Sequence, residues 1–204
     1  MRLTLIALLL AGVVGCDPTP EDDRKKNTES VENRMAAVNA EAGSNAQADY
    51  ELALKHRDAQ EYVKAAKWYR KAAEQGHVEA QVTLGHCYWA GNGVPRDHAE
   101  AARWFRKVVL RGHTPLFHYA TKFLSRIYRS DIGDSSDLKD DIEAYGWCHA
   151  GATFSPKDAN EKLQHDQLLE DITSLENRLT SKQLAAGQKR AEELLEQINA
   201  NKAK

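Results

Sequence analysis

Apolar residues recur at helical spacing in the middle of the chain and predict a pair of antiparallel helices between residues 80 and 112. The glycines of Gly91-Asn92-Gly93 favour the left-handed conformation in which helices end, so the first helix stops there. Asp97 followed by Glu100 has the spacing of a capping box, which opens the second helix. The inward stripes consist of Ala80, Leu84 and Tyr88 on the first helix, and of Ala101, Trp104 and Val108 on the second.

This helix pair repeats along the chain. The segment 65–71 recurs 36 residues later as 101–107, with the same order of two alanines, a cation, tryptophan, an aromatic residue and two cations. A weaker third copy, Ala144-Tyr145-Gly146-Trp147, lies 43 residues after the second. A period in this range is typical of a helical solenoid, in which each unit packs against its neighbours.

The second unit carries the most specific pattern. It consists of Leu84-Gly85, Tyr88, Gly91 and Gly93-Val94, followed by Asp97, Ala101, Trp104 and Gly112. By this pattern residues 44–152 resemble the Sel1-like repeat (SLR), a relative of the tetratricopeptide repeat. The first unit departs from it with Lys55 and Arg57 at the loop glycines, and the third with Ser125 at the packing glycine. The resemblance implies an all-α fold, a short right-handed α/α solenoid of about three helix-pair repeats.

Residues 153–204 predict a further helix pair that caps the solenoid. Pro156 suits a first helical position, and Thr180 with Gln183 has the pattern of a capping box. Solenoids end in units with a polar outer face, which this charged pair supplies. A dimerising coiled coil is the rival interpretation, but its heptads are too few and irregular. The apolar stripes are Leu168, Ile172, Leu175 and Leu179, and then Leu184, Ala185, Leu194, Leu195 and Ile198.

Residues 1–15 have the pattern of a bacterial lipoprotein signal peptide. The apolar run Leu3–Val14 would span roughly 18 Å as a helix, which is short of the about 30 Å of a membrane core. The run ends in Val13-Val14-Gly15-Cys16, which resembles a lipobox. The resemblance implies cleavage before Cys16 and lipidation of Cys16 by palmitate-type acyl chains that anchor the protein to the membrane. A plain signal peptide with a chance cysteine is the alternative.

Residues 16–43 predict a flexible tether that begins at the lipidated cysteine. The segment is polar and charged, and it lacks the apolar periodicity of a packed element. We therefore expect the protein on the periplasmic side of a bacterial membrane. Asp17 resembles an inner-membrane retention signal, which favours the inner membrane and leaves the outer membrane as the alternative.

Charge and motif content narrow the expected ligands. The 204 residues carry 28 Lys and Arg against 30 Asp and Glu, a net charge of −2, whereas nucleic-acid binders usually carry a basic excess. The sequence contains no glycine-rich phosphate loop, serine triad motif or paired-carboxylate signature. We therefore expect no nucleic acid, no cofactor, no small-molecule substrate and no catalytic residue.

Three other groups of residues have structural interpretations. The repeat alignment places Cys87 and Cys148 in apolar columns, so buried thiols are expected rather than a disulfide between them. The histidines lack metal-binding spacing, and the acidic loop Asp131–Asp137 lacks the pattern of a calcium site, so no metal is expected. A stripe of cations on the second helices is expected to be a solvated face rather than an anion site: Lys64, Lys67, Arg70, Lys71, Arg103, Arg106, Lys107 and Arg111.

The concave side of the solenoid, which the first helices line, is the candidate binding surface. The second unit presents His86 and Trp89 there, and the equivalent positions of the third unit are Arg126 and Arg129. Grooves that combine tryptophan with arginine are typical of protein-binding hot spots. The alternative is that Trp89 packs beneath the Gly91 loop.

These features predict a membrane-anchored periplasmic module that binds another protein as an adaptor or scaffold of the cell envelope. The resemblance also permits a second role, because some short SLR lipoproteins resemble immunity proteins that inhibit secreted toxin effectors of the phospholipase type. An envelope hydrolase is the remote alternative, since it requires a nucleophile or carboxylate pair that the sequence lacks.

Overall fold

The computed structural model describes residues 45–112, 114–129, 138 and 140–202. The chain divides into two compact units, Met1–Glu41 and Ala42–Lys204, and all described residues belong to the second. The predicted signal peptide, Cys16, the tether and the loop 130–137 lie outside the described residues. Among the helices of the described part, none combines the length and apolar character that a membrane span requires.

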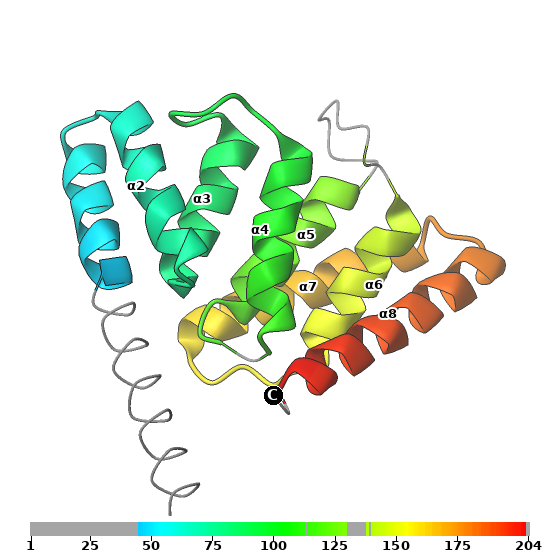
Figure 1. Cartoon of the computed structure of the whole chain (residues 1–204). Coiled ribbons are helices and arrows are strands. Elements are labelled where there is room, and N and C mark those ends of the chain that lie inside the picture. Colours follow the sequence, from blue (N-terminus) through cyan, green and yellow to red (C-terminus); the bar gives the residue numbers. More distant parts are fainter. Residues whose placement is uncertain (1–44, 113, 130–137, 139, 203–204) are drawn as a thin grey trace, which may run out of the picture. The chain divides into compact units, whose positions relative to one another are not determined.

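Three helix pairs follow one another along the second unit, as predicted (Figure 1). In the second and third pairs the second helix packs on the first, and neighbouring helices of successive pairs also pack together. In the first pair, Tyr50 contacts Tyr69 and Asp49 pairs with Lys71. The described residues contain helices and turns only, which confirms the all-α solenoid. The pairs are residues 45–58 with α2 (Tyr62–Glu74), α3 (Val78–Ala90) with α4 (His98–Leu110), and α5 (Phe117–Tyr128) with α6 (Asp141–Ala152).

The turn of the second pair has the conformation that its sequence predicts. Gly91 ends α3 in the left-handed region with φ of 80°. The Asp97 carboxylate then accepts a hydrogen bond of 2.9 Å from the backbone N–H of Glu100 and so caps α4. Gly93 also has positive φ, and a Cβ there would clash with the carbonyl of Tyr62 at the start of α2. The loop can therefore approach α2 only because residue 93 is glycine.

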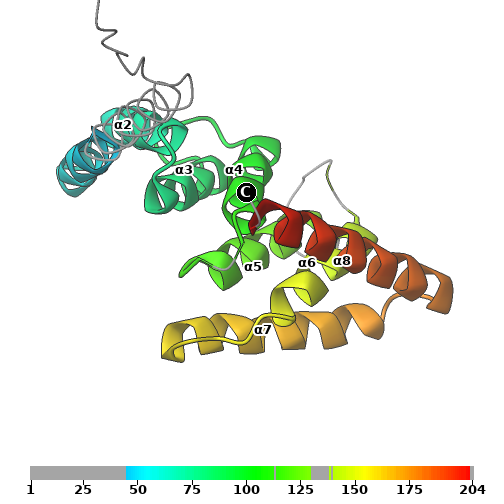
Figure 2. The same ribbon diagram turned by 60° about the horizontal axis from the view of Figure 1, so that its bottom comes forward.

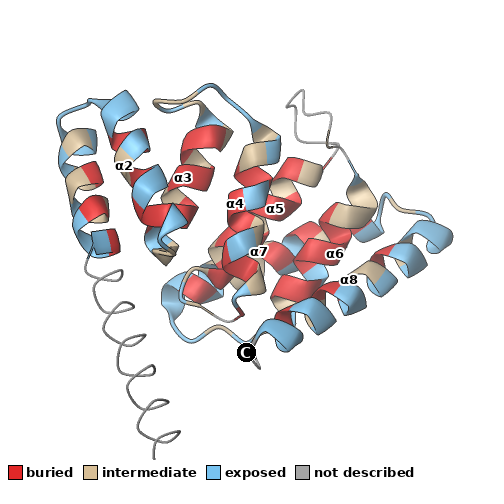
Figure 3. Cartoon of the chain, in the orientation of Figure 1, coloured by how far each residue is buried: buried red, intermediate tan, exposed pale blue. Residues whose placement is uncertain are grey.

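The core lies between the first and second helices (Figure 3). Gly85 allows this close packing, since a Cβ at that position would lie 3.1 Å from the ring of Phe105. Trp104 and Trp147 are buried on the second helices, as the repeat pattern predicts. Side chains of successive repeats thus form one continuous core.

The two C-terminal helices differ from the expected helix pair. α7 (Ala159–Glu176) packs on α5 and α6, whereas α8 (Ser181–Lys202) packs on α6 and reaches α4. The two helices therefore cover opposite sides of α6 (Figure 2). α7 begins after Asp158, whose carboxylate accepts a hydrogen bond from Glu161 N–H, so the expectation that Pro156 opens the helix was wrong.

A close helix contact at Gly187 and an ion pair hold α8 against α6. A Cβ at Gly187 would lie 2.7 Å from the ring of Tyr145, so the helices approach closely. Arg190 donates hydrogen bonds of 2.6 and 3.1 Å to the Glu143 carboxylate on α6. Leu194 and Ile198, which a coiled coil would use at its seam, are buried in the core of this chain.

Candidate functional site

Three of the four predicted binding residues meet on the surface formed by residues 45–58, α3, α5 and α7, which we call the first-helix face. The ring centroids of His86 and Trp89 are 5.4 Å apart on α3. The guanidinium of Arg126 on α5 lies 5.7 Å from the centroid of the Trp89 ring, within the range of a cation–π interaction. Trp89 thus contacts side chains of the next repeat.

Phe123 completes this group, and the sequence analysis did not identify it. Its ring centroid lies 5.5 Å from that of His86 and 5.2 Å from that of Trp89, and Arg126 lies 5.9 Å above it. Phe123 precedes Arg126 by three residues and therefore shares its helix face, a spacing that could have revealed it. We call His86, Trp89, Phe123 and Arg126 the aromatic–arginine cluster.

Arg129 does not belong to the open surface, in contrast to the prediction. The residue is 8% exposed, and its guanidinium pairs with the Asp171 carboxylate on α7. It also donates a hydrogen bond of 3.3 Å to the Ser174 hydroxyl. Repeat alignment made Arg129 equivalent to Trp89, but the third repeat is followed by α7, which covers this position.

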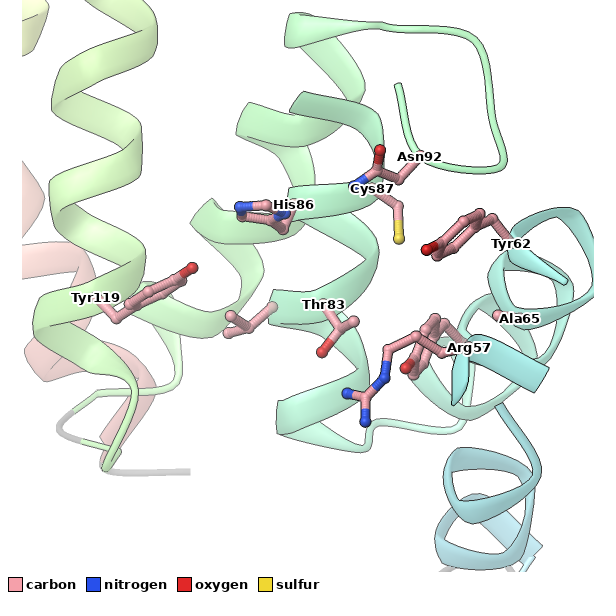
Figure 4. Close-up of a pocket in the computed structure, with 10 residues that line it drawn as sticks. Arg57, Tyr62, Ala65, Thr83, His86, Cys87, Asn92 and Tyr119 are labelled. Atoms are coloured by element: carbon pink, nitrogen blue, oxygen red, sulfur yellow. The ribbon is translucent and has the colours of Figure 1, made fainter. Parts of the chain in front are cut away.

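A hollow of about 290 Å³ lies beside the aromatic–arginine cluster, between the first and second repeats (Figure 4). We call it the tyrosine hollow. Its apolar walls include Tyr62, Tyr69, Val82 and Tyr119, and its polar groups include Arg57, Thr83, His86 and Asn92. Tyr62 and Arg57 extend toward the hollow from one side, and Tyr119 lies across from them (Figure 4).

Tyr69 lines this hollow, and its hydroxyl group makes no hydrogen bond to the described residues. The residue is 1% exposed. Burial raises the pKa of the Tyr69 hydroxyl to about 12. A buried hydroxyl normally finds a partner, so the Tyr69 hydroxyl is an exception in the wall of the hollow.

A second hollow of about 140 Å³ lies between α5 and α7 and collects positive charge. We call it the cation hollow; it is lined by Lys122, Arg126, Arg129, Gln167 and Asp171. Burial, and secondarily the charge of Arg126, lowers the pKa of Lys122. Burial also raises the pKa of Asp171, although Arg129 and Arg126 oppose that effect.

Most cations of the second helices have interaction partners within the chain. Arg111 donates a hydrogen bond of 2.6 Å to the Gly76 carbonyl, and Lys71 donates one of 2.9 Å to the Asp49 carboxylate. Arg106 donates to the Tyr128 hydroxyl at 3.1 Å. Lys107 lies 4.0 Å from the centroid of the Trp104 ring.

Cys87 and Cys148 are buried free thiols, as predicted. Burial raises the pKa of Cys87 to about 11 and that of Cys148 to about 12, so both are protonated at neutral pH. Within residues 45–202, apart from the undescribed positions, no three His, Cys, Asp or Glu side chains are grouped as metal ligands would be.

The fold defines a class of protein, the helical-repeat solenoid. Comparison with protein families refines this class, because the Sel1 repeat model matches residues 46–77 and 78–113. The chain therefore contains two Sel1 repeats, which coincide with the first two helix pairs, and such repeats are generally protein–protein interaction modules. The pair α5–α6 lies beyond this match, in agreement with the degenerate pattern expected of the third unit.

Several solved structures are similar to this chain, including one from Escherichia coli and one from Oxalobacter formigenes. One is c5321, a protective antigen present in uropathogenic Escherichia coli strains that displays an SLR fold, with a TM-score of 0.58 and 28% identity. The match covers 78% of this chain but only 32% of that chain. The other is a Sel1 repeat protein from Oxalobacter formigenes, with a TM-score of 0.48 and 25% identity over 70% of this chain and 62% of that chain. No curated protein matches the chain.

Proposed function

We propose that the protein is an adaptor or scaffold that binds another protein through its first-helix face and is anchored to the periplasmic side of a bacterial membrane. The aromatic–arginine cluster is the observation that carries this proposal. Trp89 and Arg126 are only partly buried, although tryptophan and arginine dominate the energetics of protein interfaces. The tyrosine hollow and the cation hollow lie beside the cluster, and side chains of a partner can fit into them.

The two faces of the solenoid differ in a way that favours the first-helix face. On the second-helix side, α8 covers α6 and reaches α4, and most cations are occupied within the chain. On the first-helix face, the tyrosine hollow and the cation hollow remain open. Hollows also lie on the second-helix side, one beside Lys67 and one beside Lys107, but the aromatic–arginine cluster belongs to the first-helix face and favours binding there.

The anchoring part of the proposal rests on the N-terminal sequence. A lipid on Cys16 would hold the protein on the membrane, and residues 17–43 would give the repeats reach into the periplasm. Asp17 favours the inner membrane. These features suit a scaffold, and they equally suit an immunity protein that intercepts a secreted effector.

Crosslinking followed by affinity capture from native membranes tests the proposal. The wild-type chain is compared with Trp89→Ala and with the matched control Trp68→Ala. Trp68 is also half-buried and also lies under a cation, at 4.9 Å from Lys71, but it belongs to α2. We expect one enriched protein that is lost from Trp89→Ala and retained by Trp68→Ala.

The identity of the captured protein separates the two roles. An envelope component supports the scaffold, whereas a secreted phospholipase whose activity falls on binding supports the immunity role. Equal recovery by all three chains would move the interface away from the first-helix face. A reproducible hydrolytic activity that a point mutation abolishes would support the hydrolase alternative instead.

A further inference from the structure

The cation hollow holds more positive than negative charge. Lys122, Arg126 and Arg129 come from α5, and only Asp171 from α7 opposes them. Arg129 is paired with Asp171, whereas neither Lys122 nor Arg126 has a carboxylate within ion-pair distance among the described residues. Lys122 and Arg126 are also one helical turn apart, a spacing at which like charges repel. Lys122 donates a hydrogen bond of 3.0 Å to the neutral Gln164 side chain. Among the residues that line the recess, Asp171 is thus the one carboxylate for three cations.

Two buried polar groups beside the hollows also lack partners. The Nε of Arg126 is buried and has no hydrogen-bond acceptor among the described residues. The hydroxyl of Tyr69, in the tyrosine hollow, likewise has no partner. An unsatisfied buried group costs stability, and a bound molecule that supplies the missing partner removes that cost.

The two hollows are linked through the aromatic–arginine cluster. His86 and Tyr119 line the tyrosine hollow, and the rings of Tyr119 and Phe123 are 4.8 Å apart. Arg126 lines the cation hollow and lies above both Phe123 and Trp89. One short segment of chain can therefore reach both hollows across the cluster.

We infer that the occupant of the first-helix face is an acidic segment of a partner protein. A carboxylate of this segment binds Lys122 and Arg126 in the cation hollow, and an apolar side chain a few residues away enters the tyrosine hollow. The inference rests on the proposed function, because it names the chemistry of the partner at that same face. Charge complementarity supports it, since a carboxylate supplies the counterion that α5 lacks.

The phosphate of a lipid headgroup is another anion that could bind in the cation hollow of a membrane-anchored protein. The chemistry of the neighbouring tyrosine hollow disfavours a lipid as the occupant. His86 and Asn92 place polar groups among the aromatic walls, together with the unpartnered Tyr69 hydroxyl. These groups can bind the amides of a peptide backbone, whereas an acyl chain would leave them unsatisfied. The surroundings therefore favour a protein segment.

Selection from a phage-displayed library of random peptides tests the inference with the full chain. The wild type is compared with Arg126→Glu and with Lys67→Glu, which makes the same charge change on the exposed surface of α2. We expect the wild type and Lys67→Glu to enrich peptides in which Asp or Glu lies within a few residues of an aromatic or aliphatic residue. The affinity of such a peptide should fall about tenfold or more in Arg126→Glu, and it should fall in all chains as salt is raised.

Arg126→Gln accompanies these variants, because it removes the charge without reversing it and keeps the test valid if Arg126→Glu unfolds. The inference is wrong if the enriched peptides lack acidic residues, if Arg126→Glu and Arg126→Gln bind them as tightly as the wild type, or if no peptide is enriched. It is also wrong if vesicles of phosphatidylglycerol, and no peptide, bind in an Arg126-dependent manner.

The result separates this inference from the proposed function. If Trp89→Ala abolishes capture of the partner but peptide selection shows no acidic preference, the first-helix face is the interface and its ligand chemistry is wrong. If capture does not depend on Trp89 and no peptide binds, the proposed function fails together with the inference.

Discussion

Arg129 on α5 and Asp171 on α7 form an ion pair whose side chains are 10% and 11% exposed. The pair joins two helices that are separated by the whole of α6 in the sequence. Water is largely excluded from it, so each charge depends on the other. The pair holds α7 on the first-helix face and forms one wall of the cation hollow.

Asp171→Asn is therefore expected to destabilise the protein strongly. It removes the carboxylate that pairs with the buried Arg129 guanidinium, and breaking a buried ion pair from one side costs about 3–5 kcal/mol in comparable cases. Chemical denaturation followed by circular dichroism measures the loss. Asp166→Asn is the control on the same helix, since Asp166 pairs with Lys162 at 2.9 Å on the exposed surface and its loss should have a much smaller effect.

The double variant Arg129→Met/Asp171→Leu examines the cause of that loss. Replacement of both charges removes the buried guanidinium together with the carboxylate that pairs with it, so much of the stability should return. If the double variant is as unstable as Asp171→Asn, the ion pair itself, rather than the cost of an unpaired charge, holds α7 in place.

The repeats could be predicted from short sequence patterns, because each helix pair is formed by contacts between residues that lie close together in the sequence. Gly91, Asp97 and the apolar stripes determine the structure of a single helix pair. The helix α3 ends at Gly91 and α4 begins after Asp97, as these residues predict. Gly85 acts between adjacent helices, and its contact with Phe105 follows from the repeat.

The sequence did not reveal how α7 and α8 pack. Their positions depend on pairs such as Arg129 with Asp171 and Arg190 with Glu143, which are more than forty residues apart and have no local signature. The candidate site was predicted in part for the same reason. His86, Trp89 and Arg126 could be found by repeat equivalence, whereas the burial of Arg129 depends on α7.

Gly187→Leu is expected to lift α8 from α6. A Cβ at this position already lies 2.7 Å from the ring of Tyr145, so a larger side chain cannot fit without moving the helix. Overpacking of this kind typically costs about 1–3 kcal/mol. Hydrogen–deuterium exchange should rise along α8, while Ala186→Leu, which faces solvent on the same helix, should leave exchange unchanged.

Trp104→Ala tests whether the repeat alignment places the core correctly. Trp104 is 4% exposed, and truncation of a buried aromatic residue costs about 3–5 kcal/mol. Its equivalent in the first repeat, Trp68, is half-buried, so Trp68→Ala should cost clearly less. A loss below about 1 kcal/mol for Trp104→Ala would contradict its place in the core.

Cys16→Ala tests the proposed lipid anchor. In cells fed an alkyne analogue of palmitate, the wild-type chain should incorporate the label and sediment with membranes. Cys16→Ala should lose the label, whereas Cys87→Ala, which changes a buried thiol of the repeats, should retain it. An unlabelled wild-type chain would favour the plain signal peptide.

His86 is expected to make stability depend on pH. Burial lowers the pKa of His86 below its ordinary value of 6.5, because a partly buried imidazolium loses hydration. Below pH 6.5 the unfolded chain therefore binds more protons at this residue than the folded chain does. The stability that neutral His86 contributes is fully present above pH 6.5 and is lost as the pH falls through the folded pKa. Thermal unfolding midpoints of the wild type and His86→Gln should accordingly converge as the pH falls toward 5, with the wild type losing more. Parallel pH profiles for the two chains would show that His86 titrates as it does in the unfolded state, and NMR of its ring protons would measure that pKa directly.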